Sequence, residues 1–145
     1  MAWEQGNEKK AFKLFHQAAE QGDENSLLNL GYCYDEGVGT IKNKMKAMYW
    51  YKKAAQNGDL SAYTNIAIYY ASIGDFTQAK CWYLDALKKG DKDAALGLAK
   101  LGLDGNINLS HVEIFEYLQI IIDAKRMVEV SEASQEEARL LLEQL

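Results

Sequence analysis

The sequence predicts an all-α fold, a solenoid of stacked helix pairs with about seven or eight helices. Three segments of the chain are near copies of one another and lie 36 and then 32 residues apart: Ala18–Asp23, Ala54–Asp59 and Ala86–Asp91. A repeat of this length is typical of supersecondary units that bury their apolar faces only by stacking. The 145 residues also include no proline, a residue that interrupts helices.

Each copy closes a helix whose positions recur from one repeat to the next. Eleven residues before the first alanine of each copy stand Asn7, Asn43 and Asp75, whose side chains are expected to cap a helix start. A stripe at helical spacing follows, and in each repeat it combines a small residue with two large ones: Ala11, Leu14 and Phe15; Ala47, Trp50 and Tyr51; Ala79, Trp82 and Tyr83. The glycine of each copy is expected to end its helix in the left-handed conformation.

A second helix is expected after each of these glycines, and its pattern also recurs. It has a small residue, an aliphatic residue four positions later and a small residue directly after that: Ser26, Leu30 and Gly31; Ala62, Ile66 and Ala67; Ala94, Leu98 and Ala99. Small residues at the same helix positions predict close helix crossing. Glycine inside a helix costs about 1 kcal/mol relative to alanine, so we expect packing to require the missing side chain of Gly31.

The C-terminal part predicts a helix with a marked start. Ser110 and Glu113 match a capping box. The helix is expected to run for about 15 residues, a usual helix length, with an apolar face through Phe115, Leu118 and Ile122.

A final helix is expected to start near Ser131 or Ser134 and to separate the last repeat from water. Its glutamates are expected opposite Leu140, Leu141 and Leu142. The whole chain, 1–145, is interpreted as one solenoid. Its parts are a half repeat (7–22), three repeats (23–58, 59–90 and 91–126) and a C-terminal capping helix (127–145).

The first full repeat carries a family resemblance. The residues that carry it are Leu30-Gly31, Tyr34, Gly37-Val38-Gly39, Ala47, the run Trp50–Ala55, and Gly58. In that order they resemble the Sel1-like repeat, a relative of the tetratricopeptide repeat with a longer loop between its helices. In the next repeat Ile73-Gly74-Asp75 replaces the Gly-Val-Gly loop, which accounts for the shorter spacing of 32 residues. The resemblance implies a right-handed α-α superhelix.

Composition and charge narrow the functional classes. The net charge of −5 lies entirely in residues 61–145, which carry eight basic and thirteen acidic side chains, whereas residues 1–60 carry eight of each. Nucleic-acid binding is not expected, because it needs a basic stripe. The first residues have no basic and apolar leader pattern, and no stretch has the roughly 20 apolar residues of a membrane span. We therefore expect a cytoplasmic protein with no membrane partner.

Catalytic, metal and cofactor sites are not predicted. His16 and His111 are the two histidines and are expected at the surface, and no Cys-x-x-Cys or His-x-x-His spacing suits a metal. The glycine-rich segment 37–40 lacks the Gly-Lys-Ser/Thr ending of a phosphate cradle, so we expect a turn of the repeat. Cys33 and Cys81 are expected to be buried thiols. The expected protein is not an enzyme and uses no cofactor.

The resemblance implies a protein partner and a surface for it. In tetratricopeptide-like arrays the first helix of each pair lines the concave face, and the same is implied here. The exposed positions expected on that face are Asn29, Tyr32, Asn65, Ile68, Tyr69, Lys100 and Asp104. Asparagine can hold a peptide backbone and tyrosine offers a large contact area with a polar tip. The structural alternative is that Tyr32 and Tyr69 pack between helices.

The expected function is a protein–protein interaction module, acting as a bacterial-type adaptor or scaffold or as a dedicated inhibitor. An alternative is an immunity protein that neutralises a cognate toxin, since small Sel1-like proteins include such factors. In that case a basic toxin domain would lie against the acidic C-terminal half. An enzyme that uses the groove as a pocket is a less favoured alternative, because no nucleophile and base are paired.

Overall fold

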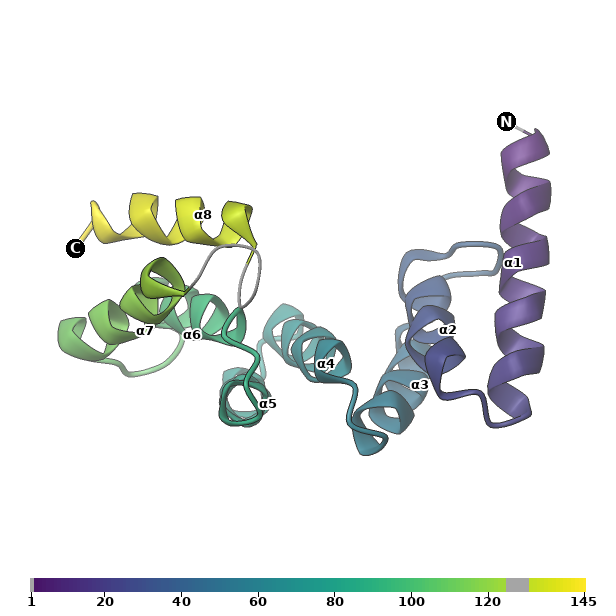
Figure 1. Cartoon of the computed structure of the whole chain (residues 1–145), viewed down its shortest axis with the longest axis horizontal. Helices are drawn as coiled ribbons and strands as arrows, with labels where there is room; N and C mark the ends of the chain where they lie inside the picture. The colour runs from purple at the N-terminus through teal and green to yellow at the C-terminus, as the bar shows by residue number, and fades with distance from the viewer. Residues whose placement is uncertain (1, 125–130) are drawn as a thin grey trace. The chain divides into compact units, whose positions relative to one another are not determined.

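The structure, a computed structural model, describes residues 2–124 and 131–145, with side chains from Glu4 onward. These residues form eight helices and no strand (Figure 1). The helices are α1 (Ala2–Glu20), α2 (Glu24–Glu36), α3 (Lys44–Gln56), α4 (Leu60–Ser72), α5 (Phe76–Lys88), α6 (Ala94–Leu103), α7 (His111–Asp123) and α8 (Glu132–Leu142). The prediction of an all-α fold with seven or eight helices is confirmed for this part of the chain.

Two compact units make up the chain, and the boundary between them falls inside α4. The N-terminal unit is Met1–Ile66 and contains α1, α2, α3 and the first half of α4. The C-terminal unit is Ala67–Leu145 and contains the rest of α4 and α5 to α8. Each unit has its own helix packing and is described by itself.

The repeated glycines end their helices in the same way. Gly22, Gly58 and Gly90 have φ values of 87°, 87° and 102°, in the left-handed region. At the second of them the Gly58 amide donates to the Ala55 carbonyl (2.9 Å) and the Asp59 amide donates to the Ala54 carbonyl (3.1 Å). The other two helix ends have the equivalent pair of bonds. This is a Schellman motif, and it satisfies carbonyls that the helix leaves unpaired.

Two of the three predicted N-caps are confirmed. The side chain of Asn43 accepts from the Lys46 amide at 3.0 Å, and that of Asp75 accepts from the Gln78 amide at 3.2 Å. The third prediction is wrong, because Asn7 lies exposed inside α1, which already begins at Ala2. No turn interrupts the helix before this residue, and asparagine inside a helix costs less than about 1 kcal/mol.

In the N-terminal unit, α2 packs against both α1 and α3. Leu30 is fully buried, and a Cβ added to the adjacent Gly31 would lie 2.5 Å from Cδ1 of Tyr51. The loop between α2 and α3 also approaches α1 closely. Gly39 has a φ of +70°, and a Cβ there would lie 2.2 Å from the carbonyl oxygen of Glu8. Gly31 therefore leaves space for the side chain of Tyr51, and Gly39 lets the loop approach the backbone of α1.

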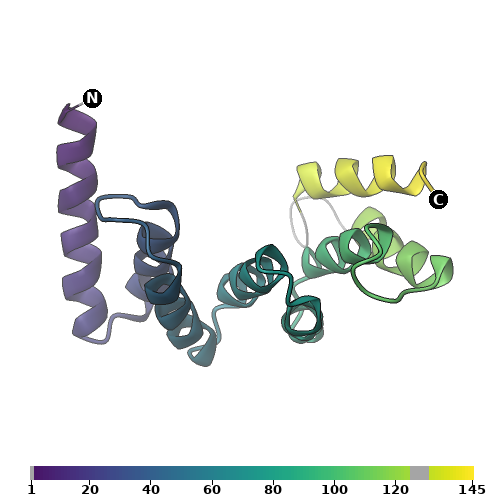
Figure 2. The ribbon, with the colours of Figure 1, turned by 180° about the vertical axis from the view of Figure 1, so that it is seen from behind.

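In the C-terminal unit, α6 packs against α5 and α7, and α7 packs against α8, which lies along it in both views (Figures 1 and 2). The core is mainly aliphatic and consists of Ala95, Leu96, Ala99, Ile114, Leu118, Ile121, Ala124 and Ala138. The capping box at the start of α7 is confirmed, since the Ser110 amide donates to Glu113 Oε2 (2.8 Å) and the Glu113 amide donates to Ser110 Oγ (3.2 Å). These bonds from Ser110 hold the pKa of Glu113 below its usual range.

The last helix begins after Ser131, whose side chain accepts from the Ser134 amide at 3.1 Å. Its predicted apolar face is confirmed in part. Leu141 and Leu142 are partly buried against the core, as predicted, whereas Leu140 is 52% exposed. Ala138 and Gln135, which were not predicted on this face, are buried, and Gln135 Nε2 donates to the Ala124 carbonyl at 2.7 Å.

One of the two cysteine predictions is wrong. Cys33 is buried as predicted, and burial together with the charge of Glu8 raises the pKa of its thiol. Cys81 is exposed, because it lies two residues from each of the buried positions Ala79 and Tyr83 and so points to the opposite face of α5. His16 is partly buried, with its ring 6.2 Å from the ring of Trp50, and it lines a surface hollow.

Candidate functional site

The residues predicted to bind a partner lie in both units. In the N-terminal unit, Asn29 and Tyr32 stand one turn apart on α2 and are both exposed. Asn29 Nδ2 donates to the Asn25 carbonyl of its own helix at 3.2 Å, so the amide oxygen is the part directed at a partner. Asn65, on α4, is half-buried. The structure therefore brings the first two together on one helix.

In the C-terminal unit, Ile68 is exposed on α4, and the neighbouring Tyr69 is half-buried with its ring 5.6 Å from that of Tyr70. Lys100, on α6, forms an ion pair with Glu137 of α8. Asp104 follows the end of α6 and is exposed. Lys100 thus has a structural partner, while Ile68 and Asp104 remain accessible. A common role of all seven residues in one surface stays a prediction.

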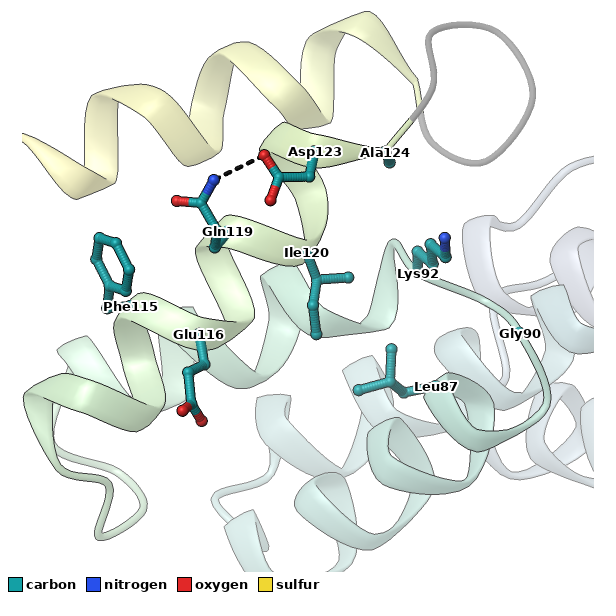
Figure 3. Close-up of a pocket in the computed structure, with 9 residues that line it drawn as sticks. All are labelled: Leu87, Gly90, Lys92, Phe115, Glu116, Gln119, Ile120, Asp123 and Ala124. Carbon is teal, nitrogen blue, oxygen red and sulfur yellow. Dashed lines mark hydrogen bonds between the residues drawn. The ribbon is translucent and has the colours of Figure 1, made fainter.

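A hollow of about 570 Å³ lies within the C-terminal unit (Figure 3). It is formed by the end of α5, the turn after it and one face of α7, and its lining is Leu87, Gly90, Lys92, Phe115, Glu116, Gln119, Ile120, Asp123 and Ala124. In Figure 3, Leu87 and Ile120 point toward one another across it. The Gly90 turn shapes one side, because its left-handed φ of 102° sends the chain from α5 toward α6.

The apolar part of the hollow includes an exposed aromatic ring. Phe115 was predicted to lie on the core face of its helix, but the buried residues of α7 are Ile114, Leu118 and Ile121, and Phe115 is 49% exposed. An exposed aromatic next to a partly apolar hollow is typical of protein contact sites. The sequence does not separate the two possibilities, because Phe115, Leu118 and Ile122 are spaced three and four residues apart just as well as the buried Ile114, Leu118 and Ile121 are spaced four and three.

Acidic groups stand at the margin of the hollow. Glu116 and Asp123 are seven residues apart on α7, so both lie on the face that lines it, with Cα atoms about 10.5 Å apart. Gln119 Nε2 donates to Asp123 Oδ1 at 2.7 Å, which leaves the second carboxylate oxygen of Asp123 for other contacts (Figure 3). The carboxylates are therefore placed to receive basic groups from a partner.

The ionisable side chains that line the hollow are Lys92, Glu116 and Asp123, and its nine lining residues include no serine, threonine, cysteine, histidine or tyrosine. Over the described ranges, 2–124 and 131–145, no three or more His, Cys, Asp or Glu residues are grouped to hold a metal ion. In the same ranges no helix combines the length and apolar character that crossing a membrane requires.

The chain matches known repeat proteins in sequence. Residues 4–23 and 25–59 match the family described as Sel1 repeat. A curated relative, DAP3-binding cell death enhancer 1 of Rattus norvegicus, is 42% identical over 53 residues, which make up 37% of this chain and 10% of that protein. The chain spans between 10% and 20% of the length of curated relatives such as this one.

It also matches solved structures. A Sel1 repeat protein from Oxalobacter formigenes has a TM-score of 0.67 and 25% identity, over 94% of this chain and 65% of that one. A protective antigen of uropathogenic Escherichia coli strains, which displays an SLR fold, has a TM-score of 0.66 and 27% identity, over 75% of this chain and 24% of the antigen. The predicted solenoid class is confirmed by these likenesses.

Proposed function

We propose that this chain, whose residues 4–23 and 25–59 match the Sel1 repeat family, is a protein-interaction module whose C-terminal unit binds a basic segment of a partner protein. The segment lies in the hollow between α5 and α7. An apolar side chain of the partner occupies the space beside Phe115, Leu87 and Ile120, and a lysine or arginine of the partner meets Glu116 or Asp123.

The observation that carries this proposal is the exposed Phe115 ring in an apolar hollow whose margin carries carboxylates. A buried aromatic anchor can be worth 2 kcal/mol or more at an interface, about thirty-fold in affinity. A charge pair at the exposed margin contributes less, about 0–1 kcal/mol. The apolar anchor is therefore expected to set affinity, and the carboxylates are expected to set the choice of a basic partner and the association rate.

The charge of the C-terminal unit supports a basic partner. All five excess negative charges of the chain lie after residue 66. Sel1 repeat proteins are generally protein-interaction adaptors, and the rat relative bears the name of a protein that binds another protein. Tyr32 of the N-terminal unit and Ile68 of the C-terminal unit are exposed, and each remains a proposed contact residue within its own unit.

The proposal is tested by selecting binders from a displayed library of random twelve-residue peptides against the whole chain. Peptides that combine lysine or arginine with an apolar residue are expected to be enriched. Their affinity is expected to fall at least ten-fold on the variant Phe115→Ala. The matched control is Val112→Ala, which removes an apolar side chain that is 65% exposed on the same helix but outside the hollow.

A charge reversal separates the two parts of the site. Glu116→Lys is expected to weaken the basic peptides, most strongly at low salt, whereas Glu143→Lys beyond the end of α8 is expected to change little. Equal loss on Val112→Ala and Phe115→Ala, or enrichment of peptides without basic residues, would contradict the proposed site.

Adaptor and inhibitor forms of the proposal differ in what happens to the partner. An adaptor leaves the partner's own activity intact, whereas an inhibitor, including an immunity protein against a basic toxin domain, occludes it. Once a partner protein is identified, its activity with and without an excess of this chain distinguishes the two forms. In the adaptor form, which we favour because the N-terminal unit offers a separate surface, the activity of the bound partner is unchanged.

A further inference from the structure

The N-terminal unit carries a second surface of different chemistry, which we name the aromatic–lysine face. Its residues come from α1, the end of α2 and one side of α3: Phe12, Lys13, His16, Tyr34, Lys46, Tyr49, Trp50 and Lys53. All of them lie within Met1–Ile66. The face is separate from the hollow of the C-terminal unit and from the exposed residues of α2.

Aromatic rings form the base of this face. The Phe12 ring stands edge-on to the Tyr34 ring with centroids 5.3 Å apart, and His16 lies 5.8 Å from Phe12 and 6.2 Å from Trp50. Beside them is a hollow of about 540 Å³, lined by Phe12, Lys13, His16, Gln17, Tyr34 and Thr40. It has room for one large apolar side chain of a partner.

Two lysines are held against these rings. The ammonium nitrogen of Lys46 lies 5.4 Å from the centre of the Tyr34 ring. That of Lys53 lies 4.7 Å from the Tyr49 ring and 5.2 Å from the Trp50 ring. Cation–π attraction of about 0.5–1 kcal/mol at such exposed sites restrains a flexible side chain. The two positive charges are therefore positioned next to an apolar surface before any partner arrives, which lowers the ordering cost of binding.

Exposed apolar side chains continue from the loop before α3 onto α3 itself. Ile41, in that loop, is 87% exposed, Met45 in the first turn of α3 is 80% exposed, and Tyr49 stands one turn beyond Met45. Such a line of exposed apolar residues is costly in water unless a partner covers it. Methionine adapts its shape to different contacts, so the line suits a partner side chain at more than one position.

The charges around this line favour an anionic partner. Lys13, Lys46 and Lys53 stand on the face. The carboxylates near it are Glu20, 3.5 Å from His16 Nδ1, and Glu8, which lines a hollow with Lys9 and Ile41. Lys44, at the start of the same helix, is already paired with Asp35. The face thus combines an excess of positive charge with a hollow and an exposed apolar line.

We infer that the aromatic–lysine face binds an acidic segment of a second protein, with an apolar side chain in the Phe12–Tyr34 hollow and carboxylates at Lys46 and Lys53. Nucleic acid fits less well, because base stacking needs open ring faces. Tyr34 and Trp50 are only 6% and 9% exposed, and the exposed ring of Tyr49 already has the Lys53 ammonium 4.7 Å from its centre. Exposed aliphatic side chains such as Ile41 and Met45 instead match the apolar residues of a protein segment. With the basic segment proposed for the C-terminal unit, the chain is an adaptor for two partners of opposite charge.

The same displayed peptide library tests this inference on the whole chain. A second class of binders, rich in aspartate and glutamate around an apolar residue, is expected. Their affinity is expected to fall at least ten-fold on the double variant Lys46→Glu with Lys53→Glu and at least three-fold on Met45→Glu. The matched controls are Lys88→Glu and Ile73→Glu, an exposed lysine and an exposed isoleucine outside the face, and they are expected to leave affinity within two-fold.

Met45→Glu keeps the test decisive, because this side chain is exposed and the change should leave the melting temperature unaltered. Phe115→Ala must leave the acidic class unaffected, so that failure of the C-terminal site and failure of this one are distinguished. Absence of an acidic class, or equal binding by wild type and the Lys46→Glu with Lys53→Glu variant, overturns the inference. Binding of phosphatidylserine vesicles or of a twenty-residue oligothymidine through this face, without an acidic peptide class, also overturns it.

Discussion

In both units a buried tyrosine packs against a glycine, but the glycine lies on a different neighbouring helix in each unit. Tyr51 and Tyr83 occupy equivalent repeat positions, and each ring lies where a glycine leaves space. In the N-terminal unit the glycine is Gly31 of α2, the helix before the tyrosine, whereas in the C-terminal unit it is Gly97 of α6, the helix after it. A recurring large residue therefore requires a small one opposite, and either neighbouring helix can supply it.

The units also differ in what they bury and expose. The N-terminal unit buries aromatic side chains such as Tyr34, Trp50 and Tyr51, while the core of the C-terminal unit is mainly aliphatic. The N-terminal unit has balanced charge with lysines beside aromatic rings, and the C-terminal unit carries the whole negative excess. The helical repeat architecture persists while the surfaces diverge, and the proposal assigns a different partner to each surface.

The largest effect is expected from removing residues 127–145, which include α8. Ala138 and Gln135 would no longer cover Leu118 and Ile121, and Gln135 would no longer bond to the Ala124 carbonyl. We expect aggregation or a loss of roughly 3 kcal/mol or more in the free energy of unfolding. Urea denaturation measures it. Leu140→Ser, at an exposed position of α8, serves as the control and should cost less than about 0.5 kcal/mol. An unchanged truncated protein would mean that α8 has no stabilising role.

Leucine at the two packed glycines should come next. Gly31→Leu is expected to cost at least the upper end of the roughly 1–3 kcal/mol seen for overpacking, because its Cβ would lie 2.5 Å from Cδ1 and 2.6 Å from Cε1, on the side of the buried Tyr51 ring. Gly97→Leu should cost less, because its Cβ meets the tip of the Tyr83 ring, which is easier to displace. Gly6→Leu, with open space around it, is the control. Equal melting temperatures for the Gly31→Leu and Gly6→Leu variants would contradict the packing of Tyr51 on α2.

The helix caps give a smaller and symmetrical effect. Asn43→Ala in the N-terminal unit and Asp75→Ala in the C-terminal unit each remove one bond to a helix-start amide. Each is expected to lower the free energy of unfolding by about 1 kcal/mol. Asn7→Ala should be neutral or slightly stabilising, because Asn7 lies inside α1. If Asn7→Ala lowers the free energy of unfolding as much as Asn43→Ala does, Asn7 caps a helix as the sequence predicted.

The smallest expected effect appears at alkaline pH. Burial, the Asp35 charge and the 3.2 Å bond that the Tyr51 hydroxyl donates to Asp35 raise the pKa of Tyr51, whereas burial alone raises that of Tyr83. The unfolded chain ionises near pH 10 while the folded tyrosines stay neutral, so stability is lost as pH rises above about 10. Denaturation at increasing pH should show a shallower decline for Tyr51→Phe than for wild type. Identical slopes would show that Tyr51 ionises normally in the folded chain.

The recurring features of the fold could be predicted from the sequence, because each depends on a residue type that a helix end or a close contact requires locally. Glycine at a left-handed helix stop, asparagine or aspartate at a helix start and glycine beside a large ring are visible in one chain, and Gly58, Asp75 and Gly31 behave as predicted. The prediction failed where a residue occupied the same repeat position as a capping residue but the helix around it began elsewhere. Asn7 matched Asn43 in position, but α1 extends further upstream.

The candidate site was harder to predict than the fold. Phe115 was assigned to the core because it is apolar, yet its place on α7 depends on a helix phase that Ile114, Leu118 and Ile121 set. The aromatic–lysine face joins residues from three helices, and no spacing in the sequence relates His16 to Trp50 or Lys46 to Tyr34. Lys100 was assigned to a binding surface, but its ion pair with Glu137 requires α8 beside α6. Helical spacing in the sequence does not show which distant segments are in contact, so these sites could not be predicted from it.

The central claim is that the two units bind partners of opposite charge. Hydrogen–deuterium exchange of the whole chain, measured with a selected basic peptide and separately with a selected acidic one, tests it most directly. The account predicts that the basic peptide slows exchange in residues 87–92 and 115–124, and that the acidic peptide slows it in residues 12–17 and 40–53. Protection of one and the same segment by both peptides, or protection confined to α2 and α6, would contradict it.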